Sequence, residues 1–337
     1  MTLLERYDAL LLDLDGTVYR GGSAVDGAEP AIRAAHQAGV GVRFVTNNAS
    51  RTPEDVAEHL NRLGVPAKHD EVTTSAQAGA GVLVGRVPAG SDVLVLGTDA
   101  LAREVTNRGF RPVRAAGDGV TAVLQGLSQQ VGWAELAEAC LAIRAGALWV
   151  ACNADRTLPT ERGLLPGNGA LVEAVRVATD AEPLVAGKPQ RPLMDDAIRA
   201  QGARHPLAVG DRLDTDIAGA NNVGIDSLLV LTGVSTAADL LAAPANLRPT
   251  YVAADLHGIE RDDVRIEARD GWQVDVTDTE LSLRHNGSDT DPLGALRALC
   301  AAWWAAHDGA VGVRPLDDAA AKAVAALRLP AAGSGIG

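Results

Sequence analysis

The stretch Ala9-Leu10-Leu11-Leu12-Asp13-Leu14-Asp15-Gly16-Thr17 decides how this chain is expected to fold. Residues 9–12 are apolar and have the composition of a fully buried strand in a parallel sheet. Asp13 follows this strand directly and Asp15 lies in the turn beyond, at the edge where open α/β sheets bind ligands. Two carboxylates this close repel each other, so they require a divalent cation or a shared proton. Taken alone, the pair fits an Asx turn that caps a strand equally well.

Three further polar clusters also follow apolar runs. They are Thr46-Asn47-Asn48 after residues 42–45, Gly187-Lys188-Pro189 after residues 184–186, and Gly210-Asp211 after residues 207–209. Because the carboxyl ends of parallel strands meet at one edge of a sheet, we expect these four strand ends to converge. Lys188 is one of only three lysines in the chain. Its compact ammonium group suits a site shared by a phosphoryl group and a carboxylate better than a planar guanidinium does.

Composition excludes several classes of protein. The chain has 337 residues, of which 47% are hydrophobic, and its formal net charge is -13. This charge argues against a general nucleic-acid or anionic-membrane binder, and no apolar run of the length needed to span a membrane is present. The cysteines are Cys140, Cys152 and Cys300, too few and too irregularly spaced for a disulfide framework or a metal site. With no charged-then-apolar leader at the N-terminus, we expect a cytoplasmic protein.

Strands and helices alternate in two separate stretches, residues 1–82 and 184–257. Strands are expected at 9–12, 41–45, 184–186, 207–209 and 227–231, and helices near 28–38, 53–63, 192–201 and 214–222. Such alternation implies a parallel sheet with right-handed crossovers. We therefore predict that the two stretches share one sheet, in a Rossmann-like three-layer α/β core.

The remaining two segments read as additions to this core. Residues 83–183 have strand patterns and a helical pattern of their own, at 93–96, 120–124, 147–151 and 133–145, which predicts an inserted α/β cap domain. Residues 258–337 are expected to form a small α+β extension, with a two-strand unit at 272–284 and helices at 293–307 and 317–327. This extension shows no catalytic cluster. We expect it to be a packing or dimerisation module, with Trp303 and Trp304 in its core.

The order of the four strand-end motifs resembles the haloacid dehalogenase superfamily. Asp13-Leu14-Asp15-Gly16-Thr17 is similar to its first motif, Thr46 to its second, Lys188 to its third, and Gly210-Asp211 through Asp216 to its fourth. An insertion between the second and third motifs is where the C2-capped branch carries its cap. The phrases around Thr46, Lys188 and Asn153-Ala154-Asp155 look like the small phosphate-ester phosphatases of that branch. The resemblance covers residues 1 to about 255.

The resemblance implies a phosphatase mechanism with assigned roles. Asp13 would be the nucleophile and form an aspartyl phosphate, and Asp15 would be the general acid and base. Mg²⁺ would be bound by the Asp13 and Asp211 carboxylates and the Asp15 backbone carbonyl. The substrate's phosphoryl oxygens would be held by Thr46, Asn47, Asn48 and Lys188. Two roles stay open for Asp214 and Asp216: they could hold waters on the metal, or they could be ordinary acids at a helix N-terminus.

The expected substrate is a small polyol or sugar phosphate ester, with glycerol 3-phosphate favoured by the resemblance. Phosphoglycolate, pyridoxal phosphate and a nucleotide stay open as alternatives within the same branch. A different class also stays open, a phosphate-sensing regulatory protein whose tail recruits a partner, although such a sensor needs neither nucleophile nor acid. The sequence leaves undecided whether a homo-oligomer forms through the cap or the C-terminal module.

Overall fold

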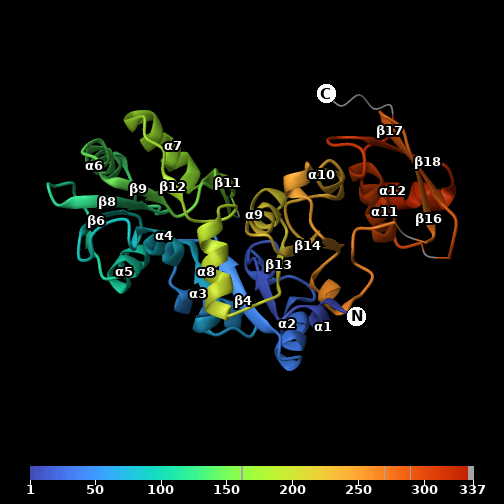
Figure 1. Ribbon diagram of the computed structural model, residues 1–337, viewed down its shortest axis with the longest axis horizontal. Coiled ribbons are helices and arrows are strands. Elements are labelled where there is room, and N and C mark those ends of the chain that lie inside the picture. The colour runs from blue at the N-terminus through green and yellow to red at the C-terminus, as the bar shows by residue number, and fades with distance from the viewer. Residues whose placement is uncertain (161, 269, 289, 333–337) are drawn as a thin grey trace. The chain divides into compact units, whose positions relative to one another are not determined.

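A computed structural model describes residues 1–160, 162–268, 270–288 and 290–332 of the chain (Figure 1). Its contacts divide the chain into two compact units. The first unit is Met1–Val42 with Ala203–Gly337, and the second is Arg43–Gly202.

The first unit contains a parallel sheet that begins with the expected N-terminal strand. Its strands, in the order β15-β14-β13-β1, are Tyr251–Ala253, Asp226–Val230, Pro206–Gly210 and Ala9–Leu12. Every residue of β1 is buried, which confirms the prediction from its apolar sequence. The other elements here are α1 (Leu3–Arg6), β2 (Tyr19–Arg20), β3 (Ser23–Ala24), α2 (Ala28–Gln37), η2 (Leu213–Ile217), α9 (Ala218–Val223), α10 (Ala237–Leu241), η3 (Ala245–Leu247) and η4 (Leu256–Glu260).

The C-terminal segment shares one apolar core with this sheet. It consists of β16 (Trp272–Val276), β17 (Glu280–His285), α11 (Pro292–Trp304), β18 (Gly312–Pro315) and α12 (Asp318–Ala326), and β18 adds a third strand, parallel to β17, to the expected pair. Leu229 and Val252 of the sheet belong to the same buried cluster as Leu283 and Trp303. The guanidinium of Arg297 donates two hydrogen bonds to the Val252 carbonyl. The segment is therefore an integral part of the first unit's core.

The second unit is built around a five-stranded parallel sheet. Its strands, in the order β12-β9-β8-β6-β7, are Leu184–Val185, Leu148–Ala151, Val120–Gln125, Asp92–Leu96 and Arg111–Val113. β4 (Gly41–Thr46) pairs in parallel with β5 (Val72–Thr74), and an antiparallel hairpin joins β10 (Thr157–Thr160) to β11 (Gly163–Pro166). The remaining elements are α3 (Pro53–Arg62), η1 (His69–Glu71), α4 (Ser75–Leu83), α5 (Asp99–Asn107), α6 (Trp133–Arg144), α7 (Asn168–Thr179) and α8 (Arg191–Gln201).

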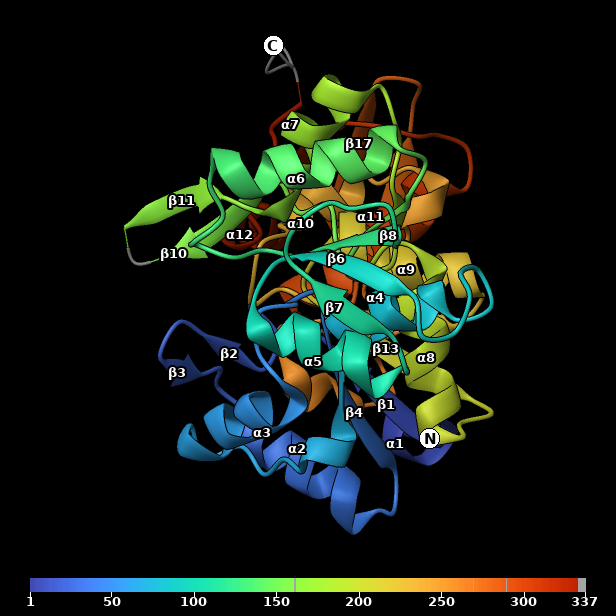
Figure 2. The ribbon, with the colours of Figure 1, turned by 90° about the vertical axis from the view of Figure 1, so that its left-hand side faces the viewer.

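Alternating side chains divide the five-stranded sheet between two helical layers. Val93 and Val95 of β6 pack in one cluster with residues of α4 and α5. Leu94 and Leu96 of the same strand pack in another with residues of α6 and α7. Figures 1 and 2 show these helix pairs on opposite sides of β6 and β8. Because successive side chains of a strand point to opposite faces, one apolar strand serves both layers.

The structure confirms the α/β class and most of the expected elements, but it corrects one strand. Residues 184–186 were expected to share a sheet with residues 207–209. Instead β12 pairs with β9 and is an edge strand of the five-stranded sheet, while β13 belongs to the first unit. A short apolar run carries no information about its partner strand, so periodicity alone assigned it wrongly.

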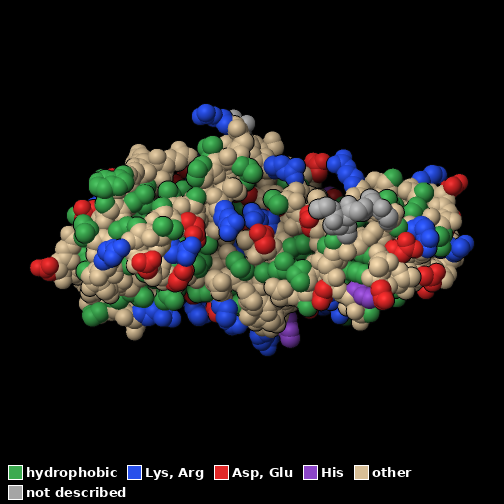
Figure 3. Space-filling view, turned by 90° about the horizontal axis from the view of Figure 1, so that it is seen from above, with side chains coloured by type: hydrophobic (Ala, Val, Ile, Leu, Met, Phe, Trp, Pro, Cys, Tyr) green, Lys and Arg blue, Asp and Glu red, His purple; other side chains and the backbone are tan. Residues whose placement is uncertain are grey.

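The surface carries both signs of charge. On the face that Figure 3 presents, acidic and basic side chains are interspersed. Within the described part of the chain, every helix is too short or too polar to cross a bilayer.

The shared core generates a prediction about Trp303. Its ring is 3% exposed and its indole N–H donates to the Gly309 carbonyl at 2.9 Å. We expect Trp303→Ala to lower the free energy of unfolding by about 3–5 kcal/mol, the usual result of removing a buried aromatic ring. Chemical denaturation measures this loss. The control is Trp133→Ala, because Trp133 is 84% exposed; equal effects of the two changes would contradict the shared core.

Candidate active site

Three carboxylates gather in the first unit at the ends of two neighbouring strands. Asp13 follows β1 and Asp211 follows β13, and the backbone N–H of Asp13 donates to the Val209 carbonyl at 2.8 Å. One oxygen each from Asp13, Asp211 and Asp216 lies within 4.8 Å of the others. We call these three residues the carboxylate cluster. Parallel pairing of β1 with β13 brings the first two together although they are far apart in sequence.

The loops around Asp211 are shaped to hold its buried side chain. Asp211 is 0% exposed and accepts hydrogen bonds from the Val234 N–H at 2.7 Å and the Thr17 hydroxyl at 3.3 Å. A Cβ atom on Gly16 would lie 2.5 Å from the Asp211 carboxylate, and one on Gly233 would clash with it as well. Both glycines therefore leave the space that this carboxylate occupies.

Asp216 and Asp214 differ in surroundings although both lie in the π-helical turn η2. Asp216 is 4% exposed and accepts a hydrogen bond from the Arg212 N–H at 3.1 Å. Asp214 makes two side-chain hydrogen bonds with Arg212, at 3.0 and 2.8 Å, and this guanidinium lowers the pKa of Asp214. Of the two acids that the sequence left open, Asp216 joins the carboxylate cluster, and Asp214 forms an ion pair with Arg212.

Asp15 lies in a turn beside the cluster. Its carboxylate is exposed and accepts a hydrogen bond from the Tyr19 hydroxyl at 3.3 Å. The N–H of Gly16 donates to the Tyr19 carbonyl at 2.7 Å, and the Thr232 hydroxyl donates to the Gly16 carbonyl at 2.6 Å. These bonds fix the turn from both sides. The Asp15 carboxylate is outside the group of close oxygens found among the described residues.

In the second unit, Asn47 is hydrogen-bonded to Lys188, another of the predicted phosphate-binding residues. Its side-chain carbonyl accepts the Lys188 N–H at 2.8 Å, and its amide donates to the Lys188 carbonyl at 3.1 Å. The Lys188 side chain is 4% exposed, and its Nζ donates to the Val45 carbonyl at 3.0 Å. Thr46 is buried at the end of β4, and its hydroxyl accepts the N–H of Asn48 at 3.1 Å. The structure thus joins Asn47 to Lys188 and Asn48 to Thr46 by hydrogen bonds, at the end of β4 and in the turn that follows it.

Two residues that are hydrogen-bonded to Asn47 were not assigned from the sequence. Asn153 donates to the Asn47 carbonyl at 2.7 Å, and Asp155 accepts the Asn47 amide with both oxygens at 3.3 Å. In the sequence, both residues belong to the phrase that resembles the phosphatase branch, which does not indicate their hydrogen-bond partners. Their signal was the position of a polar stretch directly after β9, the same pattern that marked Thr46 and Lys188.

The carboxylate cluster and the residues around Lys188 suit ligands of opposite charge. Three carboxylate oxygens within one small volume form a hard, oxygen-only donor set, which favours a divalent cation such as Mg²⁺ and is destabilised without one. The ammonium group of the buried Lys188 suits an anionic ligand. Each set occurs within one unit.

Comparison with known proteins agrees with these features. Residues 10–111 match the haloacid dehalogenase-like hydrolase model, residues 185–259 a second HAD-hydrolase-like model, and residues 269–329 a GCN5-related N-acetyltransferase-like domain. The chain is 47% identical to D-glycerol 3-phosphate phosphatase of Mycobacterium tuberculosis over 94% of this chain and 91% of that protein. It is 40% identical to acid sugar phosphatase of Staphylococcus aureus over 75% of this chain and 97% of that protein.

A solved structure is similar along nearly the whole chain. It is the glycerol phosphate phosphatase of Mycobacterium tuberculosis in complex with magnesium, with a TM-score of 0.93 and 46% identity over 98% of this chain and 99% of that one. The same protein has been solved with calcium.

The fit around Asp211 generates a prediction about Gly16. Gly16 has a φ of 89° and no room for a Cβ beside Asp211, whereas Gly21 has a φ of 58° and nothing within 4 Å of its Cβ position. We expect Gly21→Ala to lower the free energy of unfolding by about 1 kcal/mol through backbone strain alone. Gly16→Ala should cost about 1–3 kcal/mol more, because of the added clash. Chemical denaturation of both variants tests this, and losses of equal size would show that the clash is absent.

Proposed function

This chain belongs to the haloacid dehalogenase-like hydrolases and is a phosphatase, and we propose that it hydrolyses glycerol 3-phosphate to glycerol and phosphate. The observation that carries the choice of substrate is the similarity to mycobacterial D-glycerol 3-phosphate phosphatase, which covers 94% of this chain, whereas the match to acid sugar phosphatase covers 75%. Phosphoglycolate, pyridoxal phosphate and nucleotides are the substrates to compare.

Asp13 is proposed as the nucleophile. One of its carboxylate oxygens attacks phosphorus, the bond between phosphorus and the glycerol oxygen breaks, and an aspartyl phosphate forms. Asp15 gives its proton to the departing alkoxide and then takes one from the water that hydrolyses the aspartyl phosphate. The exposed position of the Asp15 carboxylate and its hydrogen bond with Tyr19 are compatible with a group that exchanges protons.

Mg²⁺ is the proposed cofactor, and the donor set fits it. Asp13 and Asp211 would contribute carboxylate oxygens, Asp15 its backbone carbonyl, and Asp216 a third carboxylate in the ion's surroundings. When bound, Mg²⁺ supplies positive charge that offsets the negative charge of the phosphoryl group and the acids. The magnesium complex of the similar mycobacterial phosphatase supports this choice.

The phosphoryl oxygens are proposed to be bound by Lys188, Thr46, Asn47 and Asn48. Lys188 supplies a positive charge, and the other three supply neutral donors. The support is the network around Asn47, which fixes the Lys188 backbone from both its N–H and its carbonyl. The Lys188 Nζ is itself held by the Val45 carbonyl at 3.0 Å, so the side chain loses little further freedom when it binds an anion.

The remaining assignments concern organisation and context. We propose a core formed by residues 1–82 and 184–257, a cap formed by residues 83–183 to whose sheet β12 (Leu184–Val185) adds an edge strand, and residues 258–337 as a packing extension. The extension's role is supported by the apolar cluster it shares with β14 and β15. The proposed setting is the cytoplasm and glycerophospholipid metabolism, because glycerol 3-phosphate is the backbone of those lipids. Homo-oligomer formation stays a prediction.

The substrate assignment is tested by a panel of phosphate esters. We expect glycerol 3-phosphate to give the highest kcat/KM among glycerol 3-phosphate, phosphoglycolate, pyridoxal phosphate and AMP, measured by phosphate release with MgCl₂ present. The expected physical reason is differential binding of the hydroxylated leaving group in the transition state. A panel member that exceeds glycerol 3-phosphate would replace it as the substrate.

Two controls tie this activity to the proposed residues. Asp13→Asn should lower kcat by at least about 10³-fold, as removal of a nucleophile does, and excess EDTA should abolish turnover. The matched variant is Asp26→Asn, because Asp26 is an exposed acid outside the carboxylate cluster. Full activity in Asp13→Asn would end the proposed mechanism.

Asp216 and Asp214 offer a matched test of the cation site. We expect Asp216→Asn to weaken Mg²⁺ binding by at least about tenfold, because it removes one negative charge from the cluster. Asp214→Asn should change the affinity by less than about threefold, since Arg212 already neutralises Asp214. Titration calorimetry with MgCl₂ measures both. Equal losses would mean that the Mg²⁺ site is not centred on the carboxylate cluster.

A further inference from the structure

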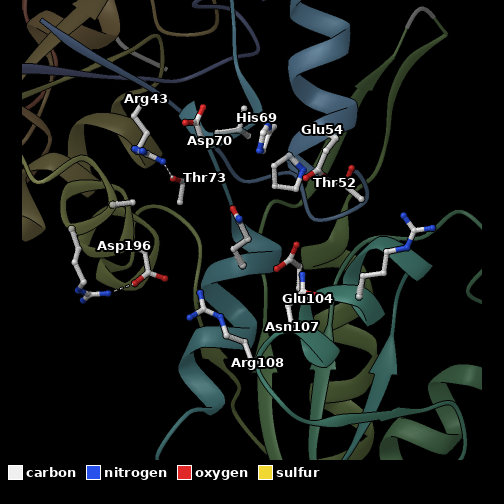
Figure 4. Close-up of a pocket in the computed structure, with 16 residues that line it drawn as sticks. Arg43, Thr52, Glu54, His69, Asp70, Thr73, Glu104, Asn107, Arg108 and Asp196 are labelled. Atoms are coloured by element: carbon white, nitrogen blue, oxygen red, sulfur yellow. Dashed lines mark hydrogen bonds and ion pairs between the residues drawn. The ribbon is translucent and has the colours of Figure 1, made fainter.

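A second polar cleft lies within the second unit and uses none of the residues assigned to phosphate binding. It has a volume of about 740 Å³, within the range of small-molecule sites. Figure 4 shows its walls, with β4, η1 and the start of α3 on one side and α5 and α8 on the other. The residues that matter below are Arg43, Glu54, Asp70, Glu104, Arg108 and Asp196.

Arg43 brings a buried positive charge to one wall. It is 7% exposed, and its guanidinium donates to the Thr73 hydroxyl at 3.1 Å and the Gln201 side-chain carbonyl at 3.3 Å. Both of these partners are neutral. Asp70 and Glu71 act on Arg43 only through their charge, and burial lowers the pKa of Arg43. Among the described residues no carboxylate forms an ion pair with this guanidinium.

Glu104 brings a buried negative charge to the facing wall. It is 8% exposed, and no basic side chain of the described chain is ion-paired with it. Burial raises the pKa of Glu104, and the negative charge of Glu54 raises it further, against opposing effects of Asn107 and Arg108. A carboxylate in this position is stabilised by a cation that enters the cleft.

The nearby ion pair does not satisfy either group. Arg199 forms an ion pair with Asp196 at 2.6 Å, so these two residues neutralise each other. Arg43 and Glu104 are therefore the two buried charges of the cleft that lack an ionic partner in the described structure. A buried charge is expensive to maintain without a counter-charge, so a cleft with one of each sign favours a ligand that carries both.

We propose that this cleft binds a small zwitterion, with its acidic group at Arg43 and its ammonium group at Glu104. The ligand class is an amino acid or another short chain with one carboxylate and one amine. The proposal depends on neither the carboxylate cluster nor Lys188, and so it stands apart from the proposed function. Because the walls come from residues 43–77, 103–108 and 196–200, a bound ligand would tie these segments together.

The test uses ω-amino carboxylates of increasing length as probes. Glycine, β-alanine, γ-aminobutyrate and ε-aminocaproate place the two charges at growing separations, and they contain no phosphorus that could occupy a phosphatase site. Titration calorimetry with the full-length protein should show saturable binding for at least one of them. Butyrate and butylammonium, which carry one charge each, should bind at least about tenfold more weakly than that probe, a ratio equivalent to about 1.4 kcal/mol.

Variants locate the binding and decide the proposal. Glu104→Gln keeps the shape of the side chain and should weaken binding of the best probe by at least about tenfold. Arg43→Gln should weaken it by a similar factor. Circular dichroism checks that both variants fold. Glu173→Gln, an exposed acid of α7 outside the cleft, and Asp13→Asn should leave binding unchanged. Absence of binding by all four probes, unchanged binding in Glu104→Gln, or equal binding of butyrate would overturn the proposal.

Discussion

The repulsion among Asp13, Asp211 and Asp216 is the constraint on which the first unit's architecture depends. Carboxylate oxygens within 4.8 Å of one another destabilise a fold unless something holds them in place and offsets their charge. Parallel pairing of β1 with β13 sets two of them side by side, and the π-helical turn η2 adds the third. The surrounding loops are fitted to this cluster, because Gly16 occupies a positive φ and leaves the Asp211 carboxylate its space.

The second unit meets a different requirement, which is to fix the backbone of Lys188, the residue proposed to bind the phosphoryl group. Asn47 does so by bonding both the N–H and the carbonyl of Lys188. Gly187 is needed beside it, because a Cβ there would lie 2.6 Å from the Asn47 side-chain oxygen. Asn153 also donates to the Asn47 carbonyl, so a segment after β9 is fixed by the same residue. One asparagine thus joins segments of the chain that are more than a hundred residues apart.

The sequence predicted these features to the extent that they depend on local patterns. Apolar runs followed by polar residues identified β1, β4 and β13 and the acids and amides at their ends, because burial and strand ends leave a mark in composition. The choice of a neighbouring strand leaves no mark in composition, and residues 184–186 were consequently assigned to the wrong sheet. The difference between Asp214 and Asp216 could not be predicted, since a side chain's direction in a π-helical turn is not set by residue spacing.

The C-terminal segment, residues 258–337, shares the apolar core of the first unit's sheet. The match to acid sugar phosphatase covers 75% of this chain and 97% of that protein, so a quarter of this chain lies outside it. Leu229 and Val252 are completely buried in a cluster completed by Leu283 and Trp303. Removing the segment would expose that apolar face to water, at a cost of about 25 cal/mol for each Å² uncovered. Because the segment completes the sheet's core, deleting it would change stability and any contribution to catalysis together. Substitution of a single buried residue separates these two contributions better than truncation does.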